Sequence, residues 1–378
     1  MDALEQVMRE RVVKGLCLSI ITLGIQSQAY AIPALPADAN MDRLPEQVEL
    51  MRRGYYIETW GSLKRLNAPD QLGCKGFEIQ AHRGHAQYTE NGPGAVMTGI
   101  TSRFNGVEVD ARQLGDGNWV FNHDATTGRT LVHPSGDVSL RSLDLNSWMI
   151  AKGRNRLGAA TNEDIYGAFD ILTVVNELTH PAQIINIELK SDPGLQCGSL
   201  GSFDAGAKAL FSKGKIGYSS MDGLPPLQCI RQFNKDAYVA LIQGPSQPAL
   251  EKWAAANHGD ELSRLKGRQR LMAGARLATK AFGAYKYPRW GTAAALTELK
   301  TKIGGDVGLH VEITDLLSDP GLTARAHKAG ISKVMTYTLT DNESHIKGLK
   351  QLKARGAMPD GAIVDSTPIK TCKMLGLE

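Results

Sequence analysis

The 378 residues include 42% hydrophobic and 22% charged residues, with 40 glycines and 16 prolines. This is the composition of an ordinary globular protein, and it supplies enough apolar side chains for a large core. The 43 Lys and Arg residues exceed the 39 Asp and Glu residues by four, and the basic residues are scattered along the chain. That distribution disfavours binding to nucleic acid through its phosphates. The length allows two or three domains, or one α/β barrel with insertions.

The first 31 residues have the pattern of a secretory signal peptide. Arg9, Arg11 and Lys14 precede an apolar run over residues 15–25, and Ala29-Tyr30-Ala31 has the small-x-small form of a cleavage site. The run is too short to span a bilayer. We therefore predict that residues 1–31 are removed and that the mature protein is exported to the periplasm or secreted, without stable membrane insertion. The competing interpretation is a buried N-terminal helix.

Residues 32–74 form a polar N-terminal extension to which we assign no chemistry, and residues 75–378 form the main domain. In this domain, short β-type runs alternate with segments of helical period, as in βα units around a parallel sheet. Eight such units predict a closed (β/α)₈ TIM barrel rather than an open sheet. The predicted strands are residues 78–82, 106–110, 184–190, 216–219, 238–242, 308–312, 333–337 and 361–365.

Two further segments lie between these strands. Residues 119–124 are a ninth β-like run that follows the second strand too closely for an intervening helix. We interpret this run as part of an elaborated loop at the barrel mouth, where catalytic residues collect. Residues 245–305 carry a basic stretch from Arg264 to Arg276. We expect that stretch to form a solvated helical face rather than a cover over the mouth.

Polar residues at strand ends carry the strongest signal. Glu108 and Asp110 share a face of the second strand, as do Glu188 and Lys190 on the third, because side chains alternate along a strand. Three carboxylates at one end of a barrel would repel one another, so we expect a divalent cation between them, supplemented by Lys190 and Arg83. Mutually paired charges on the barrel rim are the alternative.

Two histidines complete the predicted site. His82 ends the first strand and His123 lies in the mouth loop. Two imidazoles on opposite sides of a phosphorus atom suit in-line ester cleavage, because each can give or take a proton near neutral pH. His310 shares a face with Glu312, and the sequence leaves open whether it lines the site or packs. We expect the remaining histidines to have structural roles: His85, His133, His180, His258, His327 and His345.

Several motifs occur in a defined order along the chain. They are Ala81–Gly84, Glu90-Asn91, Gly106–Asp110, Asp116-Gly117, Phe121–Asp124 with Arg129-Thr130, Ile187–Lys190, Tyr337–Asp341 and Asp360–Asp365. In order and spacing, these motifs resemble those of the glycerophosphodiester phosphodiesterase family, over roughly residues 79–368. The resemblance implies a TIM barrel that hydrolyses glycerophosphodiesters to glycerol 3-phosphate and an alcohol, using one divalent cation, either Ca²⁺ or Mg²⁺.

The resemblance also assigns roles to individual residues. It implies that the metal ligands are Glu108, Asp110 and Glu188, and that the general acid and base are His82 and His123. It further implies that the phosphate contacts are Arg83 and Lys190, and that the additional site residues are Glu90 and Tyr337. Tyr337 replaces the family's usual tryptophan, and Thr89 and Gly92 depart from the family's Pro-Glu-Asn-Thr segment. These departures put the headgroup preference in doubt.

Other functions remain open at this point. A phospholipase D-type barrel acting on lysophospholipid or sphingomyelin has the same layout of His, Glu and Asp residues. A metal-free glycosidase using Glu108 and Glu188 would leave the two histidines unexplained. A secreted binding protein without activity would not need the full set of acid, base and metal candidates. For the enzyme we expect a small-molecule substrate, a monomer and no nucleic-acid partner.

The cysteines predict two disulfides. Removal of residues 1–31 leaves an even number of cysteines in a compartment that permits oxidation. Cys74 enters the first strand and Cys372 follows the eighth, and these strands become neighbours when a barrel closes. Cys197 follows the third strand, and Cys229 lies near the start of the helix after the fourth, where Pro225-Pro226 marks the helix entry. These are adjacent βα units at the barrel mouth, and we expect both cysteines in loop-like surroundings. Four reduced thiols in a protein that is not exported are the alternative.

Overall fold

The computed structural model describes residues 72–378, except residues 191, 193, 222 and 283–288. In this part of the chain, eight parallel strands form a closed barrel, since β1 pairs with both β2 and β12. All eight predicted strands are confirmed, with ends displaced by three residues at most. The strands are β1 (Glu78–Ala81), β2 (Gly106–Gln113), β7 (Ile184–Leu189), β8 (Lys215–Ser220), β9 (Tyr238–Ile242), β10 (Val307–Glu312), β11 (Lys333–Tyr337) and β12 (Gly361–Val364).

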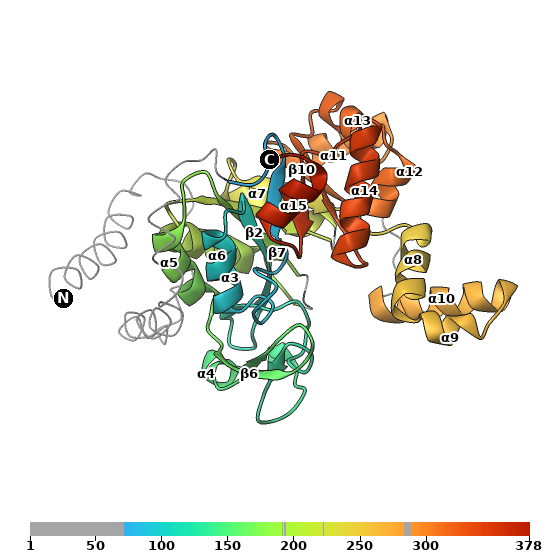
Figure 1. Ribbon diagram of the computed structural model, residues 1–378. Helices are drawn as coiled ribbons and strands as arrows, with labels where there is room; N and C mark the ends of the chain where they lie inside the picture. Colours follow the sequence, from blue (N-terminus) through green and yellow to red (C-terminus); the bar gives the residue numbers. More distant parts are fainter. Residues whose placement is uncertain (1–71, 191, 193, 222, 283–288) are drawn as a thin grey trace.

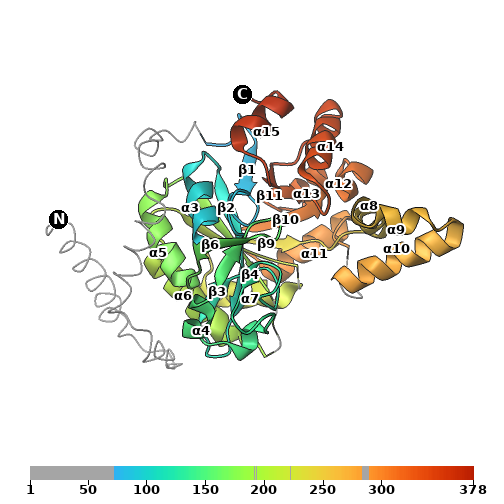
Figure 2. The ribbon, with the colours of Figure 1, turned by 60° about the horizontal axis from the view of Figure 1, so that its bottom comes forward.

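Helices surround the barrel, as Figures 1 and 2 show. Several begin at a polar residue whose side chain accepts a hydrogen bond from the first turn, as Thr292, Asp341 and Thr367 do. The surrounding helices are α3 (Pro93–Thr101), α5 (Ala168–Leu178), α6 (Cys197–Leu210), α7 (Leu224–Phe233), α11 (Ala293–Ile303), α12 (Ile313–Ser318), α13 (Leu322–Lys328), α14 (Asn342–Ala354) and α15 (Pro368–Leu375).

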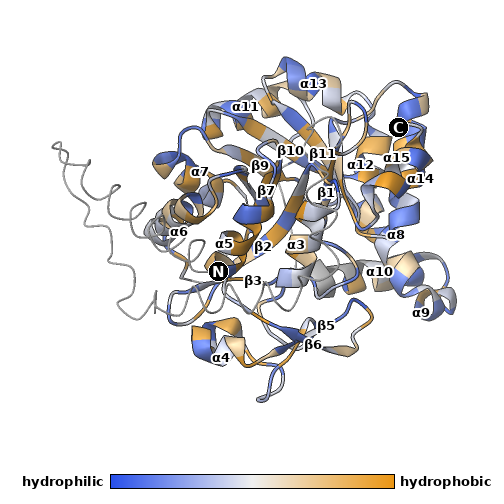
Figure 3. Cartoon of the chain, turned by 60° about the vertical axis from the view of Figure 1, so that its left-hand side comes forward, coloured by the Kyte–Doolittle hydropathy of each residue, from blue (hydrophilic) through white to orange (hydrophobic). Residues whose placement is uncertain are grey.

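The main core lies between strands and helices, where the hydrophobic colouring is concentrated in Figure 3. The amino-terminal end of the barrel interior is polar instead. There Lys333 pairs with Glu78 and lies 5.2 Å from the centre of the Tyr238 ring. His310 is fully buried, with Nε2 3.3 Å from the Tyr238 hydroxyl. His310 therefore packs inside the barrel, away from the mouth, which settles the question that the sequence left open.

An insertion over residues 122–167, hereafter the mouth insertion, follows β3 (Trp119–Phe121), which pairs antiparallel with β2. The sequence predicted an elaborated loop here, and the structure shows a small antiparallel sheet with its own core, which includes Trp148. The Trp148 indole donates a hydrogen bond to the Tyr166 carbonyl (3.1 Å). The other elements are β4 (Leu131–Val132), a 3₁₀ turn (Leu140–Ser142), α4 (Leu145–Met149), β5 (Lys152–Arg154) and β6 (Ala160–Asp164).

Three helices form an arm that projects from the barrel after β9 (Figures 1 and 2). They are α8 (Gln247–Asn257), α9 (Gly259–Ser263) and α10 (Gly267–Phe282). The basic side chains of Arg264, Arg268 and Arg270 are exposed, as expected for a solvated helical face. No helix in the described residues is long and apolar enough to cross a bilayer.

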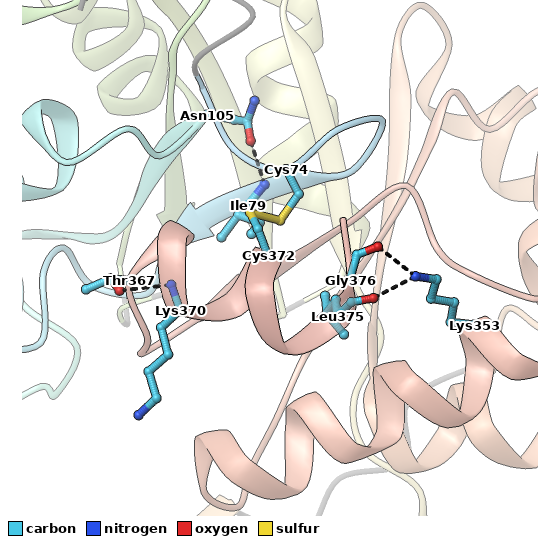
Figure 4. The surroundings of a disulfide bond; sticks show 9 residues. All are labelled: Cys74, Ile79, Asn105, Lys353, Thr367, Lys370, Cys372, Leu375 and Gly376. Atoms are coloured by element: carbon cyan, nitrogen blue, oxygen red, sulfur yellow. Dashed lines mark hydrogen bonds between the residues drawn. A yellow bond between two sulfur atoms is a disulfide. The ribbon is translucent and has the colours of Figure 1, made fainter. Parts of the chain in front are cut away.

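Two disulfides join the cysteines in the expected pairs. Cys74 is bonded to Cys372 of α15, with Cα atoms 5.2 Å apart (Figure 4). Cys197 is bonded to Cys229, with Cα atoms 5.3 Å apart. Cys229 lies in the helix predicted after the fourth strand, α7, whereas the expectation of loop-like surroundings is wrong because Cys197 begins α6 and Cys229 lies in the second turn of α7. The predicted signal peptide and nearly all of the extension lie outside the described residues.

Candidate active site

Three carboxylates meet at the carboxyl-terminal end of the barrel. Glu108 and Asp110 lie on one face of β2, and Asp110 is in register with Glu188 of β7. One oxygen from each residue lies within 4.8 Å of the other two, and all three side chains are buried. The strand ends therefore bring together the ligand set that the sequence predicted.

Two cations accompany the carboxylates. Lys190 Nζ lies 2.9 Å from Asp110 Oδ1 and donates a hydrogen bond to Glu188. The Arg83 guanidinium lies 3.4 Å from Asp110 Oδ2, and the Arg83 backbone N–H donates to Glu108 Oε2 (2.9 Å). Arg83 has a φ of 54°, a left-handed conformation that is rare for a residue other than glycine. The turn after β1 thus directs both an N–H and a guanidinium at the cluster.

The three acids do not ionise alike. Burial, together with the charges of Asp110 and Glu188, raises the pKa of Glu108 well above its usual range. Burial also raises the pKa of Glu188, although Lys190 opposes that shift. Burial opposes ionisation of Asp110 too, but Lys190, His123 and Arg83 outweigh it and hold the pKa of Asp110 well below its usual range. The three buried carboxylates therefore do not ionise together readily. A hard divalent cation, which binds oxygen ligands, would favour the charged form of all three.

Asn91 is a further site residue, which the sequence analysis named only as part of a motif. Its side chain donates to Asp110 Oδ2 (2.8 Å) and accepts from the Asp110 backbone N–H (2.9 Å). Asn91 has a φ of 61°, which asparagine tolerates better than most residues. The amide therefore fixes the orientation of the Asp110 carboxylate.

His82 belongs to a chain of three side chains. Its Nδ1 hydrogen-bonds to Oδ1 of Asp365 (3.1 Å), the residue that follows β12. Arg156 of the mouth insertion pairs with the same carboxylate. Burial opposes ionisation of Asp365, but His82 and Arg156 hold the pKa of its carboxyl well below its usual range. An ionised carboxylate can only accept, so the proton lies on Nδ1 of His82. Nε2 is then the ring atom that can exchange a proton with a substrate.

His123 has a parallel arrangement. Its Nδ1 hydrogen-bonds to Asp124 Oδ1 (2.7 Å), and Arg129 donates to the other oxygen of Asp124 (2.6 Å). Glu90 accepts from both Arg129 and Arg83, at 2.9 Å each. Burial, with the charges of Arg83 and Lys190, lowers the pKa of His123 to about 4. The ring is therefore neutral over most of the pH range and can accept a proton at Nε2.

Tyr337 lies at the end of β11 and takes no part in these hydrogen bonds. Its hydroxyl donates to the Gln243 carbonyl (2.8 Å). Burial, with the charges of Glu312, Asp315 and Glu188, raises the pKa of Tyr337 well above its usual range. The phenol is thus neutral and is held against the end of β9.

One network of hydrogen bonds and charge interactions contains seven of the predicted side chains: Arg83, Glu90, Glu108, Asp110, His123, Glu188 and Lys190. His82 is linked to it through Asp365, whose carboxylate interacts with Arg83. Asp124, Arg129 and Asp365 each lie in one of the ordered sequence motifs, but no role was predicted for them. Arg156 was missed altogether, because nothing in its sequence surroundings distinguishes it from other arginines.

Comparison with known proteins gives a consistent fold. No protein family model and no curated protein sequence matches the chain. Among solved structures, the chain is similar to a Silicibacter pomeroyi protein assigned as a glycerophosphoryl diester phosphodiesterase, with 15% identity and a TM-score of 0.58 over 84% of this chain and 96% of that one. A glycerophosphodiester phosphodiesterase from Parabacteroides distasonis has 14% identity and a TM-score of 0.52, over 80% and 98%.

A third similar structure is a phosphodiesterase from Oleispira antarctica, solved in complex with its product sn-glycerol-3-phosphate. It has 18% identity and a TM-score of 0.52, over 79% of this chain and 96% of that one. At these identities, the likenesses establish a shared barrel fold. The chain is thus an α/β barrel of the kind found in glycerophosphodiester phosphodiesterases.

Proposed function

We propose that this protein belongs to the glycerophosphodiester phosphodiesterase family and hydrolyses glycerophosphodiesters to glycerol 3-phosphate and an alcohol. The observation that carries the proposal is the meeting of three buried carboxylates with two Asp-bound histidines at one barrel mouth. The shared fold with phosphodiesterases, one of which is solved with sn-glycerol-3-phosphate, supports it.

In this proposal, Glu108, Asp110 and Glu188 hold Ca²⁺ or Mg²⁺. The cation would stabilise negative charge on the non-bridging oxygens of the phosphodiester. Arg83 and Lys190 lie beside the same carboxylates, so they are placed to contact those oxygens as well. With these groups at the phosphorus, the remaining requirement is proton transfer at the attacking and leaving oxygens.

The histidines meet that requirement. One ring takes a proton from the nucleophile at Nε2, and the other donates a proton to the leaving alkoxide. His123 suits the base role, because it is neutral above about pH 4. The nucleophile is either water or the glycerol 2-hydroxyl, which would give a cyclic phosphate that water then opens. The two routes differ in whether the cyclic ester forms.

The test is to incubate the purified protein with glycerophosphocholine and Ca²⁺ or Mg²⁺ and to assay glycerol 3-phosphate. A chelated sample and a His123→Ala variant serve as controls, and both should lose the product. Turnover only of lysophosphatidylcholine or sphingomyelin would instead favour the phospholipase D-type alternative. Full activity after exhaustive chelation would refute the role of the metal.

We also propose that the protein is exported. The pattern of residues 1–31 and the two disulfides support this proposal, because disulfides persist in oxidising compartments. Fractionation of cells that express the full chain tests it. Export predicts a mature protein that begins at residue 32 in the periplasm or the medium.

A further inference from the structure

Arg156 reaches from the mouth insertion into the barrel mouth. It lies on the turn between β5 and β6, and only 19% of its side chain is exposed. Asn155 shapes this turn, because its side chain accepts hydrogen bonds from the Leu157 and Ala159 backbone N–H groups, at 3.0 Å each. Leu157, at the tip, is 94% exposed. The turn therefore directs Arg156 inward while its neighbour faces solvent.

The guanidinium of Arg156 contacts both the backbone of His82 and the carboxylate that binds the His82 ring. Nη2 donates to the His82 carbonyl (2.6 Å) and approaches the Gly84 carbonyl (3.4 Å). Nη1 donates to Asp365 Oδ1, the oxygen that binds His82 Nδ1. One planar group thus holds both the backbone of the histidine and the carboxylate that orients its ring. A fork of donors with fixed geometry is a property of arginine and not of lysine.

We propose that Arg156 is a positioning residue for His82, and that the mouth insertion is for this reason a working part of the active site. The expected loss of kcat rests on the proposed function, whereas the expected change in the orientation of the His82 ring does not. Arg156 contacts His82 and Asp365, and the inference needs no contact with substrate.

The orientation of the His82 ring makes the inference measurable. Asp365 accepts the hydrogen bond from Nδ1 of His82 (3.1 Å), and Arg156 pairs with the same carboxylate. Arg83 faces Asp365 from the turn after β1, and His345 of α14 lies close enough to interact with both His82 and Asp365. Removal of Arg156 takes away the arginine partner of Asp365 and the side-chain donor to the His82 carbonyl. The ring should then be held less firmly in the form that carries its proton on Nδ1.

The experiment compares Arg156→Gln and Arg156→Lys with Arg154→Gln. Arg154 is the matched control: it lies on the same hairpin but donates to the Leu131 and Gly158 carbonyls, within the insertion. The first measurement is the ¹⁵N NMR spectrum of the His82 ring in the chelated protein at one pH, which distinguishes a proton on Nδ1 from a proton on Nε2. For Arg156→Gln we expect the Nε2–H form to appear beside the Nδ1–H form that the wild-type protein favours. For Arg154→Gln we expect no change.

The second measurement is steady-state turnover of glycerophosphocholine. We expect Arg156→Gln to lower kcat roughly tenfold or more with KM within about twofold, as for a lost orienting contact. Arg156→Lys should also lose kcat, because an ammonium does not present two donors in the fixed geometry of a guanidinium. If the wild-type protein does not turn over the substrate, the proposed function fails, while the His82 spectrum still tests Arg156.

Three results would overturn the inference. One is an unchanged ¹⁵N spectrum of the His82 ring in Arg156→Gln. Another is an equal effect of Arg154→Gln, which would reduce Arg156 to a support for the insertion. The third is a rise in KM with kcat intact, which would make Arg156 a contact of the substrate instead.

Discussion

Glu108→Gln should separate stability from activity. In the absence of a cation, ionised Glu108 has two acidic neighbours whose ligand oxygens lie within 4.8 Å of its own. At an effective dielectric constant of about 20, two charges at this separation repel by about 3.5 kcal/mol. Glutamine removes both repulsions and can still accept the hydrogen bond from the Arg83 N–H. The lost attraction of the Arg83 charge offsets part of the gain.

We expect a net gain of about 2 kcal/mol in the free energy of unfolding at pH 8 in chelator, or about 3 to 4 °C in Tm. The pKa of Glu108 is raised in the folded state, so its favourable contribution is complete below the unfolded value of 4.5 and is lost as pH rises. The difference between variant and wild type should therefore vanish near pH 4 and grow toward pH 8.

The assay is thermal unfolding with and without Ca²⁺ or Mg²⁺, alongside turnover. A cation should stabilise the wild-type protein but not Glu108→Gln, whose turnover should fall about a hundredfold or more. Glu298→Gln is the control, because Glu298 is an exposed carboxylate that pairs with Lys302 on the surface of α11. The reasoning is refuted if Glu108→Gln is the less stable protein in chelator and the cation stabilises both proteins equally.

Three other expectations follow from the structure. His82→Ala and His123→Ala should each lower turnover about a hundredfold or more. A substrate with a strongly acidic leaving group should restore turnover only in the variant that lacks the general acid. Equal losses on both substrates would contradict the assignment of one histidine as acid and the other as base. Replacing Cys74 and Cys372 by serine removes a cross-link between residues 298 positions apart, and the chain-entropy model predicts a loss of about 5.7 kcal/mol in the free energy of unfolding, measurable by guanidinium unfolding. Burial raises the pKa of Asp170 from 3.8 to about 6, so its favourable contribution is lost as pH rises through 6. Asp170→Asn should therefore gain up to about 3 kcal/mol above pH 7 and nothing at pH 4, and the absence of this pH dependence would contradict the assigned burial.

The barrel was predictable because its strands are short apolar runs that end in polar residues. Glu108, Asp110 and Glu188 stand out in sequence because the barrel interior rarely contains acids at such positions. The pairing of Cys74 with Cys372 was predictable because closure of the barrel makes the first and last strands neighbours. These predictions depend on strand periodicity and on chain order.

The supporting contacts were not predictable in the same way. Arg156 lies 74 residues from His82 and 209 residues from Asp365, and it reaches them from a separate small sheet. The strands of that sheet are short, and β6 is largely exposed, so they lack a strong hydrophobic alternation. The start of α6 at Cys197 was not predicted for a related reason, because Gly194 and Gly198 on either side of Cys197 are typical of a loop.

The bond between Cys74 and Cys372 closes residues 74–372 into a covalent ring, with the rest of the chain attached as two branches. Within the ring, a single cleavage of the main chain leaves both halves connected through sulfur. The termini of the chain could therefore be moved to another position in the ring. A permuted chain that begins and ends within the projecting arm, with a short peptide linker in place of the disulfide, would retain the neighbours of every barrel strand.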